Sequence, residues 1–160
     1  METNKLSEVF NNLQKEGLDT RIENRNETPL IWATSEGYSG IALALIKAGA
    51  NMNAVNSDGN TALIRAACEN RKDLAKALIE AGAHLDIQNH SGYTALILAK
   101  RRGNMEVHDL LIKAGANEAL QTNQGMTAAT TTIGERPKTS LVAPRDQNLE
   151  FKIIRQIALS

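Results

Sequence analysis

The sequence contains a single cysteine, Cys68, among 160 residues. One thiol cannot build an intramolecular disulfide or a paired-thiol zinc site, so we expect a reducing, intracellular compartment. An excess of charge of either sign is also missing, because 18 acidic residues balance 18 basic ones. No net field therefore draws the chain to nucleic acid or to an anionic membrane, and we expect neither as a partner.

Long apolar runs are missing as well. The first 20 residues are polar and charged, unlike a signal peptide, and no later stretch approaches the roughly 20 apolar residues that a spanning helix needs. We therefore expect a cytoplasmic protein without a membrane partner. A length of 160 residues suits one domain with its own core, and we expect a monomer.

Motifs for catalysis, metal binding and nucleotide binding are absent from the sequence. The three histidines, His84, His90 and His108, do not have the spacing of metal ligands. Neither a phosphate-binding glycine loop nor a GxSxG nucleophile motif occurs, and no histidine lies near Cys68 in the sequence. We predict that the protein is not an enzyme and that it holds no metal or cofactor.

The sequence does contain one phrase written three times. Successive copies begin 33 residues apart: "TPLIWA" at 28–33, "TALIRA" at 61–66 and "TALILA" at 94–99. The triplet "AGA" keeps the same period, at 48–50, 81–83 and 114–116. A fixed period of 20 to 50 residues is typical of stacked supersecondary units.

Each repeat predicts two helices and a loop. The opening threonine can cap a short first helix, such as 29–35, and Pro29 suits its first position. A left-handed break such as Gly37 follows, and then apolar residues recur at i, i+4 and i+5, the spacing of a buried helical stripe. The second helix ends at "AGA", and turn sequences such as "NSDGN" lead to the next threonine.

These motifs resemble the ankyrin repeat family. The family pattern "DxxGxTPLHxAA", followed by a second helix and "GADVN", is matched here by "NSDGNTALIRAA" with "AGANMN" and by "NHSGYTALILAK" with "AGAHLD". The resemblance implies an all-α solenoid of stacked helix-turn-helix units with projecting hairpin-like loops. Because Ile31, Ile64 and Ile97 replace the motif's histidine, packing must substitute for the hydrogen bonds which that histidine makes.

The resemblance also divides residues 1–127, the predicted ankyrin repeat domain, into five parts. They are an N-terminal cap helix, three full repeats and the start of a degenerate fourth repeat, at 1–17, 18–50, 51–83, 84–116 and 117–127. In the fourth repeat, Ala129, Thr130 and Thr132 stand where earlier repeats have Leu, Ile and Ala, so we expect its first helix to be short or irregular.

Two further segments follow the repeats. Polar residues together with Pro137 and Pro144 predict an extended linker over 128–148. Residues 149–160 predict an amphipathic helix, whose apolar face includes Ile153 and Ile157. We expect this helix to fold back as a cap over the exposed end of the third repeat. Recruitment of its apolar face by a partner or by a second copy is the alternative.

In the family that the chain resembles, partners bind a concave face made of the loop tips and the outer positions of the first helices. The resemblance places this surface on twelve residues: Arg25, Glu27, Glu36, Val55, Asp58, Asn60, Glu69, Gln88, His90, Tyr93, Arg101 and Arg102. We therefore predict a protein-protein interaction module.

Charge shifts from acidic to basic along the surface, which favours a partner of opposite polarity. Tyr93 is the best candidate for an anchoring contact. Trp32 lies in an inter-repeat column and is assigned to packing before contact.

Two other functions remain open. The chain could act as a regulatory or structural adaptor that engages its partner through the C-terminal helix. It could also be the substrate of an asparaginyl hydroxylase, because Asn53 in "AGANMN" resembles the loop asparagine that is hydroxylated in some ankyrin repeats.

Overall fold

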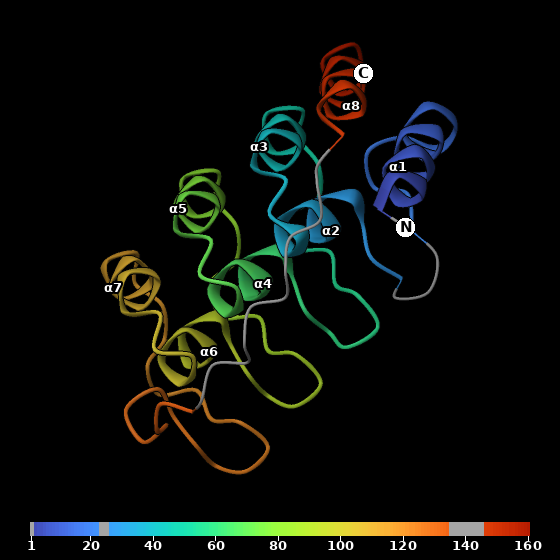
Figure 1. The fold of residues 1–160 in the computed structure, drawn as a ribbon. Coiled ribbons are helices and arrows are strands. Elements are labelled where there is room, and N and C mark those ends of the chain that lie inside the picture. The colour runs from blue at the N-terminus through green and yellow to red at the C-terminus, as the bar shows by residue number, and fades with distance from the viewer. Residues whose placement is uncertain (1, 23–25, 135–145) are drawn as a thin grey trace.

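The computed structural model describes residues 2–22, 26–134 and 146–160 and contains eight helices in them. They are α1 (Glu2–Glu16), α2 (Pro29–Glu36), α3 (Ser39–Lys47), α4 (Ala62–Cys68), α5 (Lys72–Glu80), α6 (Ala95–Arg101), α7 (Met105–Lys113) and α8 (Gln147–Ala158). Figure 1 shows α2, α4 and α6 in an inner row, beside the projecting loops, and α1, α8, α3, α5 and α7 in an outer row. The predicted all-α solenoid is confirmed.

The first helix of each repeat starts at a threonine, as predicted. The hydroxyl of Thr28 accepts a hydrogen bond from the backbone N–H of Ile31 at 3.3 Å, and the threonines at 61 and 94 make the same bond at 3.1 and 3.2 Å. These bonds satisfy backbone donors that have no partner within the helix. After α2, Gly37 takes a left-handed conformation with φ of 78° and turns the chain toward α3.

Apolar residues buried between neighbouring repeats form one continuous core. α4 packs against α2 on one side, α6 on the other and α5 behind it, and Leu63 is almost completely buried among them. The isoleucines at 31, 64 and 97 are buried to the same extent, so methyl groups fill the positions of the family motif's histidine. Trp32 is buried as well, and its ring stacks on Tyr38 with 5.0 Å between centroids.

The position of the terminal helix corrects the prediction made from sequence. α8 forms, with its buried face at Ile153 and Ile157, but it packs against α1 and α3 at the N-terminal end of the array. Figure 1 shows it between these two helices in the outer row, far from α7. The expectation that it covers the third repeat is therefore wrong, because the fitting apolar surfaces are those of α1 and α3.

The end of the third repeat is covered instead by the segment that follows it. Ala128 and Thr131 are buried, and the N–H of Gly134 donates to the carbonyl of Arg101 at 2.7 Å. The backbone N–H groups of Thr127 and Thr130 each donate to the other residue's hydroxyl within a single turn, and no helix forms between 117 and 134. Most of the predicted linker, including Pro137 and Pro144, lies outside the described residues.

Leu63→Ala tests the packing between repeats. We expect the free energy of unfolding to fall by about 2 to 5 kcal/mol, because the substitution leaves a cavity between α2, α4 and α6. Urea denaturation measures the change. Val55→Ala is the control, since Val55 is exposed at a loop and its truncation should change the stability by less than about 0.5 kcal/mol. A loss below about 1 kcal/mol for Leu63→Ala would contradict this packing.

Deletion of residues 147–160 tests the position of α8. Each of its two buried isoleucines contributes about 1.5 to 3 kcal/mol, so we expect a lower midpoint of urea unfolding. Hydrogen exchange should show loss of protection in α1 and α3 and retained protection in α6 and α7. An unchanged midpoint, or a loss confined to α6 and α7, would place α8 elsewhere.

Candidate functional site

The loops between repeats are joined to one another by hydrogen bonds. In the second loop, Asn56 Oδ1 accepts the N–H groups of Asp58 and Asn60, both at 3.0 Å, which fixes the turn. Asn89 makes the equivalent bonds in the third loop. The His90 N–H then donates to the carbonyl of Asp58 at 3.0 Å, so successive loop tips are bonded backbone to backbone. The tips are therefore held in fixed positions relative to one another.

A second set of hydrogen bonds joins the bases of the loops. Asn51 donates its N–H to Asp19 Oδ1 at 2.8 Å, His84 donates to Asn53 Oδ1 at 2.9 Å, and Asn117 donates to Asp86 Oδ1 at 2.8 Å. Each bond crosses from one repeat to the next. The side chain of Asn53, the candidate for hydroxylation, is thus half-buried and engaged with the following repeat.

At the outer ends of the first helices, one polar cluster links two repeats. Arg65 Nε donates to the hydroxyl of Ser35 at 2.8 Å, and its guanidinium lies 3.5 Å from the carboxylate of Glu69. Arg65 is not among the predicted contact residues, because it shares a column with Trp32, which is assigned to packing. The charge of Arg65 could have identified it from the sequence as a surface residue, since a charged side chain in a packing column must reach solvent or a partner.

Tyr93, which precedes α6, and Arg101, the last residue of α6, form a second cluster. The guanidinium carbon of Arg101 lies 5.1 Å from the centroid of the Tyr93 ring, which is the geometry of a cation–π contact, and the phenolic oxygen accepts a hydrogen bond from Arg101. Tyr93 is half-buried, while Arg101 is exposed. An aromatic ring is thus fixed at the surface under a cation.

The structure places eleven of the twelve predicted contact residues in three environments. Seven are exposed: Glu36, Val55, Asp58, Glu69, Gln88, His90 and Arg101. Tyr93 and Arg102 are half-buried. Glu27 and Asn60 are buried, and Arg25 lies outside the described residues.

The prediction that Glu27 and Asn60 contact a partner is corrected by their burial. Only 3% of Glu27 and 8% of Asn60 is exposed. The carboxylate of Glu27 accepts from Asn56 Nδ2 at 3.3 Å, and Asn60 Oδ1 accepts from Asn89 Nδ2 at 2.9 Å. Both side chains therefore join neighbouring loops inside the array and support the surface without forming it.

The remaining charges of this surface are distributed by sign. Acidic side chains lie on the first and second repeats, at Glu36, Asp58 and Glu69, and the cations Arg101 and Arg102 lie on the third. Of the acidic groups, Glu69, which follows the end of α4, is partly neutralised by Arg65 of that helix. The surface therefore has an electrical polarity along the array.

The thiol of Cys68 lies beside this surface. Burial raises the pKa of the thiol, and the nearby Arg102 guanidinium opposes the shift only in part. A thiol with a raised pKa is protonated at neutral pH and is a weak nucleophile.

In the part of the chain that the structure describes, no group of three or more potential ligand side chains is placed to hold a metal ion. No helix within the described ranges has the length and apolarity to cross a bilayer.

Family comparisons agree with this geometry. Residues 2–89 match the family described as ankyrin repeats in three copies, and residues 91–123 match the single ankyrin repeat. A comparison with curated proteins finds no match. Ankyrin repeats are generally protein-protein interaction modules. Since the two matches span most of the sequence and fall on the stacked helix pairs, the chain belongs to the ankyrin repeat family.

Proposed function

We propose that the protein binds a protein partner on its concave surface. This surface consists of the loop tips and the outer ends of the first helices: Glu36, Val55, Asp58, Glu69, Gln88, His90, Tyr93, Arg101 and Arg102. The observation that carries the proposal is the hydrogen bonding between successive loops, such as His90 to Asp58 at 3.0 Å. Loops already fixed to one another lose little conformational entropy when a partner binds.

The composition of the concave surface supports a polar, charged partner interface. Its acidic residues lie on the first two repeats and its arginines on the third, so a partner with basic residues opposite Glu36 and Asp58 and acidic residues opposite Arg101 would fit. Complementary charge speeds encounter and selects orientation more than it adds affinity. Binding should therefore weaken as ionic strength rises.

Tyr93 is the proposed anchor of the interface. The ring is half-buried and lies under the Arg101 guanidinium, 5.1 Å from its carbon, so few rotamers remain to be lost on binding. Tyrosine and arginine are enriched among the residues that dominate interface energies. The pair combines both types at one position.

Catalysis, a metal and a cofactor have no part in the proposed function, and the protonated Cys68 thiol fits a binding role. We further propose that binding takes place in the cytoplasm and that the protein acts as a monomer.

The alternative role as an adaptor through the C-terminal helix would need a different face of α8 from the one first expected, because Ile153 and Ile157 are buried against the protein's own helices.

A Tyr93→Ala, Arg101→Ala double variant tests the concave surface. In affinity capture with quantitative mass spectrometry, the variant should lose at least about tenfold of the partner that the wild type retains, because the anchor is gone. Lys76→Ala, Lys113→Ala is the matched control, since both lysines are exposed on the outer row. Capture that survives in the double variant, and is lost in a Phe151→Asp, Leu159→Asp variant of α8, would favour the adaptor role instead.

Asn53 tests the hydroxylation alternative. We expect the peptide that contains Asn53 to gain the mass of one oxygen in cells that possess an asparaginyl hydroxylase, and the Asn53→Ala variant to show no gain. The half-buried side chain must first release the His84 N–H, so modification should increase when the repeats are destabilised, for example by Leu63→Ala. An unmodified peptide in such cells would rule the alternative out.

A further inference from the structure

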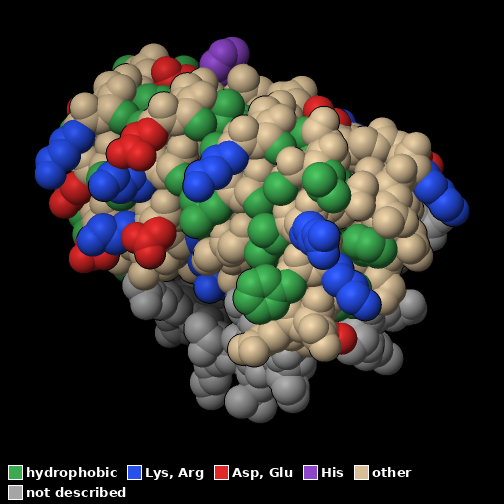
Figure 2. Space-filling model, turned by 90° about the horizontal axis from the view of Figure 1, so that it is seen from above, with side chains coloured by type: hydrophobic (Ala, Val, Ile, Leu, Met, Phe, Trp, Pro, Cys, Tyr) green, Lys and Arg blue, Asp and Glu red, His purple; other side chains and the backbone are tan. Residues whose placement is uncertain are grey.

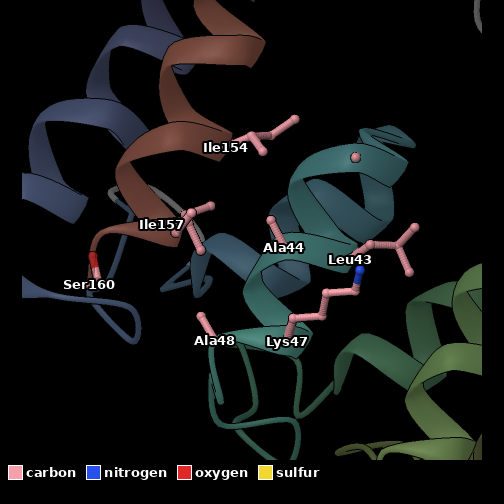
Figure 3. A pocket seen from close by; sticks show the side chains of 9 residues that line it. Leu43, Ala44, Lys47, Ala48, Ile154, Ile157 and Ser160 are labelled. Carbon is pink, nitrogen blue, oxygen red and sulfur yellow. The ribbon is translucent and has the colours of Figure 1, made fainter.

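An apolar groove lies between α3 and α8, on the outer row and away from the concave surface. Its volume is about 550 Å³, within the range of protein binding pockets. Figure 3 shows Ile154 and Ile157 of α8 facing Ala44 and Ala48 of α3 across the groove, with Leu43 on its far side. The groove between these two helices of the chain is thus open to solvent.

The outer face of α3 differs from the same face of the other repeats. Gly40 and Leu43 occupy positions that are Asp73 and Lys76 in α5, and Glu106 and Asp109 in α7. These charges on α5 and α7 are exposed, and pairs such as Lys72 with Glu106, 3.1 Å apart, cover that part of the surface. Contact with α8 accounts for Gly40, since a Cβ there would lie 3.1 Å from Ile154 Cδ1. It does not account for Leu43, which remains 38% exposed.

α8 also presents apolar side chains to the groove, at Ile154 and Ala158, whereas Lys152 and Arg155 of the same helix are exposed. Phe151, Ile154 and Ala158 follow at i, i+3 and i+7, so they share one side of the helix. Phe151 is 71% exposed and Leu159 is 76% exposed. Figure 2 shows the molecule from the side of the outer row. Hydrophobic side chains gather in the middle of that view, beside a region of mixed acidic and basic groups. Two helical stripes therefore flank the groove.

One charged side chain, Lys47, is among the described residues that line the groove. Lys47 lines it from α3, and Figure 3 shows its side chain extending along the helix toward Leu43. No acidic side chain is among the described residues that line the groove. An occupant that combines apolar and acidic groups would be complementary to these surroundings.

We propose that this groove docks an amphipathic helix of another protein, with an apolar stripe and acidic residues along its flank. Both walls are helices, and the lining on α3 runs from Gly40 to Ala48, about 12 Å at the rise of an α-helix. That length matches two turns of a helix bound through apolar residues at i, i+3, i+4 and i+7. The docking site does not depend on the concave surface, which lies on the other row.

A displayed library of helical peptides, selected on the full chain, tests the proposal. Enriched peptides should share an apolar i, i+3, i+4, i+7 stripe with acidic flanks, and they should shift the NMR signals of α3 and α8. Leu43→Asp, which places an acid where α7 has Asp109, should weaken their binding at least about tenfold. Lys47→Glu should weaken acidic peptides and favour versions whose flanking acids are replaced by lysine.

Matched controls keep the test specific. Ile133→Asp changes an exposed apolar residue that lies beside Gly103 of the third repeat, and it should leave peptide binding unchanged. The Tyr93→Ala, Arg101→Ala variant should also bind the peptides normally, which separates this site from the concave surface. The proposal is overturned if no peptide is enriched, or if Leu43→Asp binds the enriched peptides as the wild type does. It is also overturned if sedimentation shows that the chain forms a dimer through Leu43 and Phe151.

Discussion

Burial of apolar side chains between adjacent repeats is the interaction on which the rest of this structure depends. A single helix pair has no core of its own, so α4 must hide Leu63 between α2 and α6 to be stable. The same requirement acts at both ends of the array. Wherever the stacking stops, an apolar face is left that some other part of the chain has to cover.

The two ends solve this problem in different ways. At the C-terminal end, an irregular segment that includes Ala128 and Thr131 packs on the third repeat. At the N-terminal end, α8 packs between α1 and α3, so the last helix of the chain completes the first part of the core. Placing a helix there also creates the groove beside Leu43, because α8 covers only one side of α3. Capping and the proposed second binding site thus have one structural cause.

Polar groups in the loops serve the array before they serve a partner. Asn56 and Asn89 use their side-chain oxygens to close their own turns and their amide groups to reach the preceding loop. Buried polar atoms are stabilising only when their hydrogen bonds are satisfied, and these residues satisfy one another. What remains for a partner is a row of side chains that point outward from a fixed backbone.

The sequence by itself determined the repeat period, the helix starts and the turns, because each depends on residues close together in the chain. Thr28 caps α2 with its own hydroxyl, and Gly37 ends that helix through its own φ angle, so neither needs a distant neighbour. The same register led to the twelve residues predicted for the concave surface, of which nine are exposed or half-buried. The tertiary structure alone decided the position of α8, since Ile153 and Ile157 form an apolar stripe that would suit any apolar face, and only long-range packing selects α1 and α3. It also decided the burial of Glu27 and Asn60, because their bonding partners lie in the next loop, about one full repeat away.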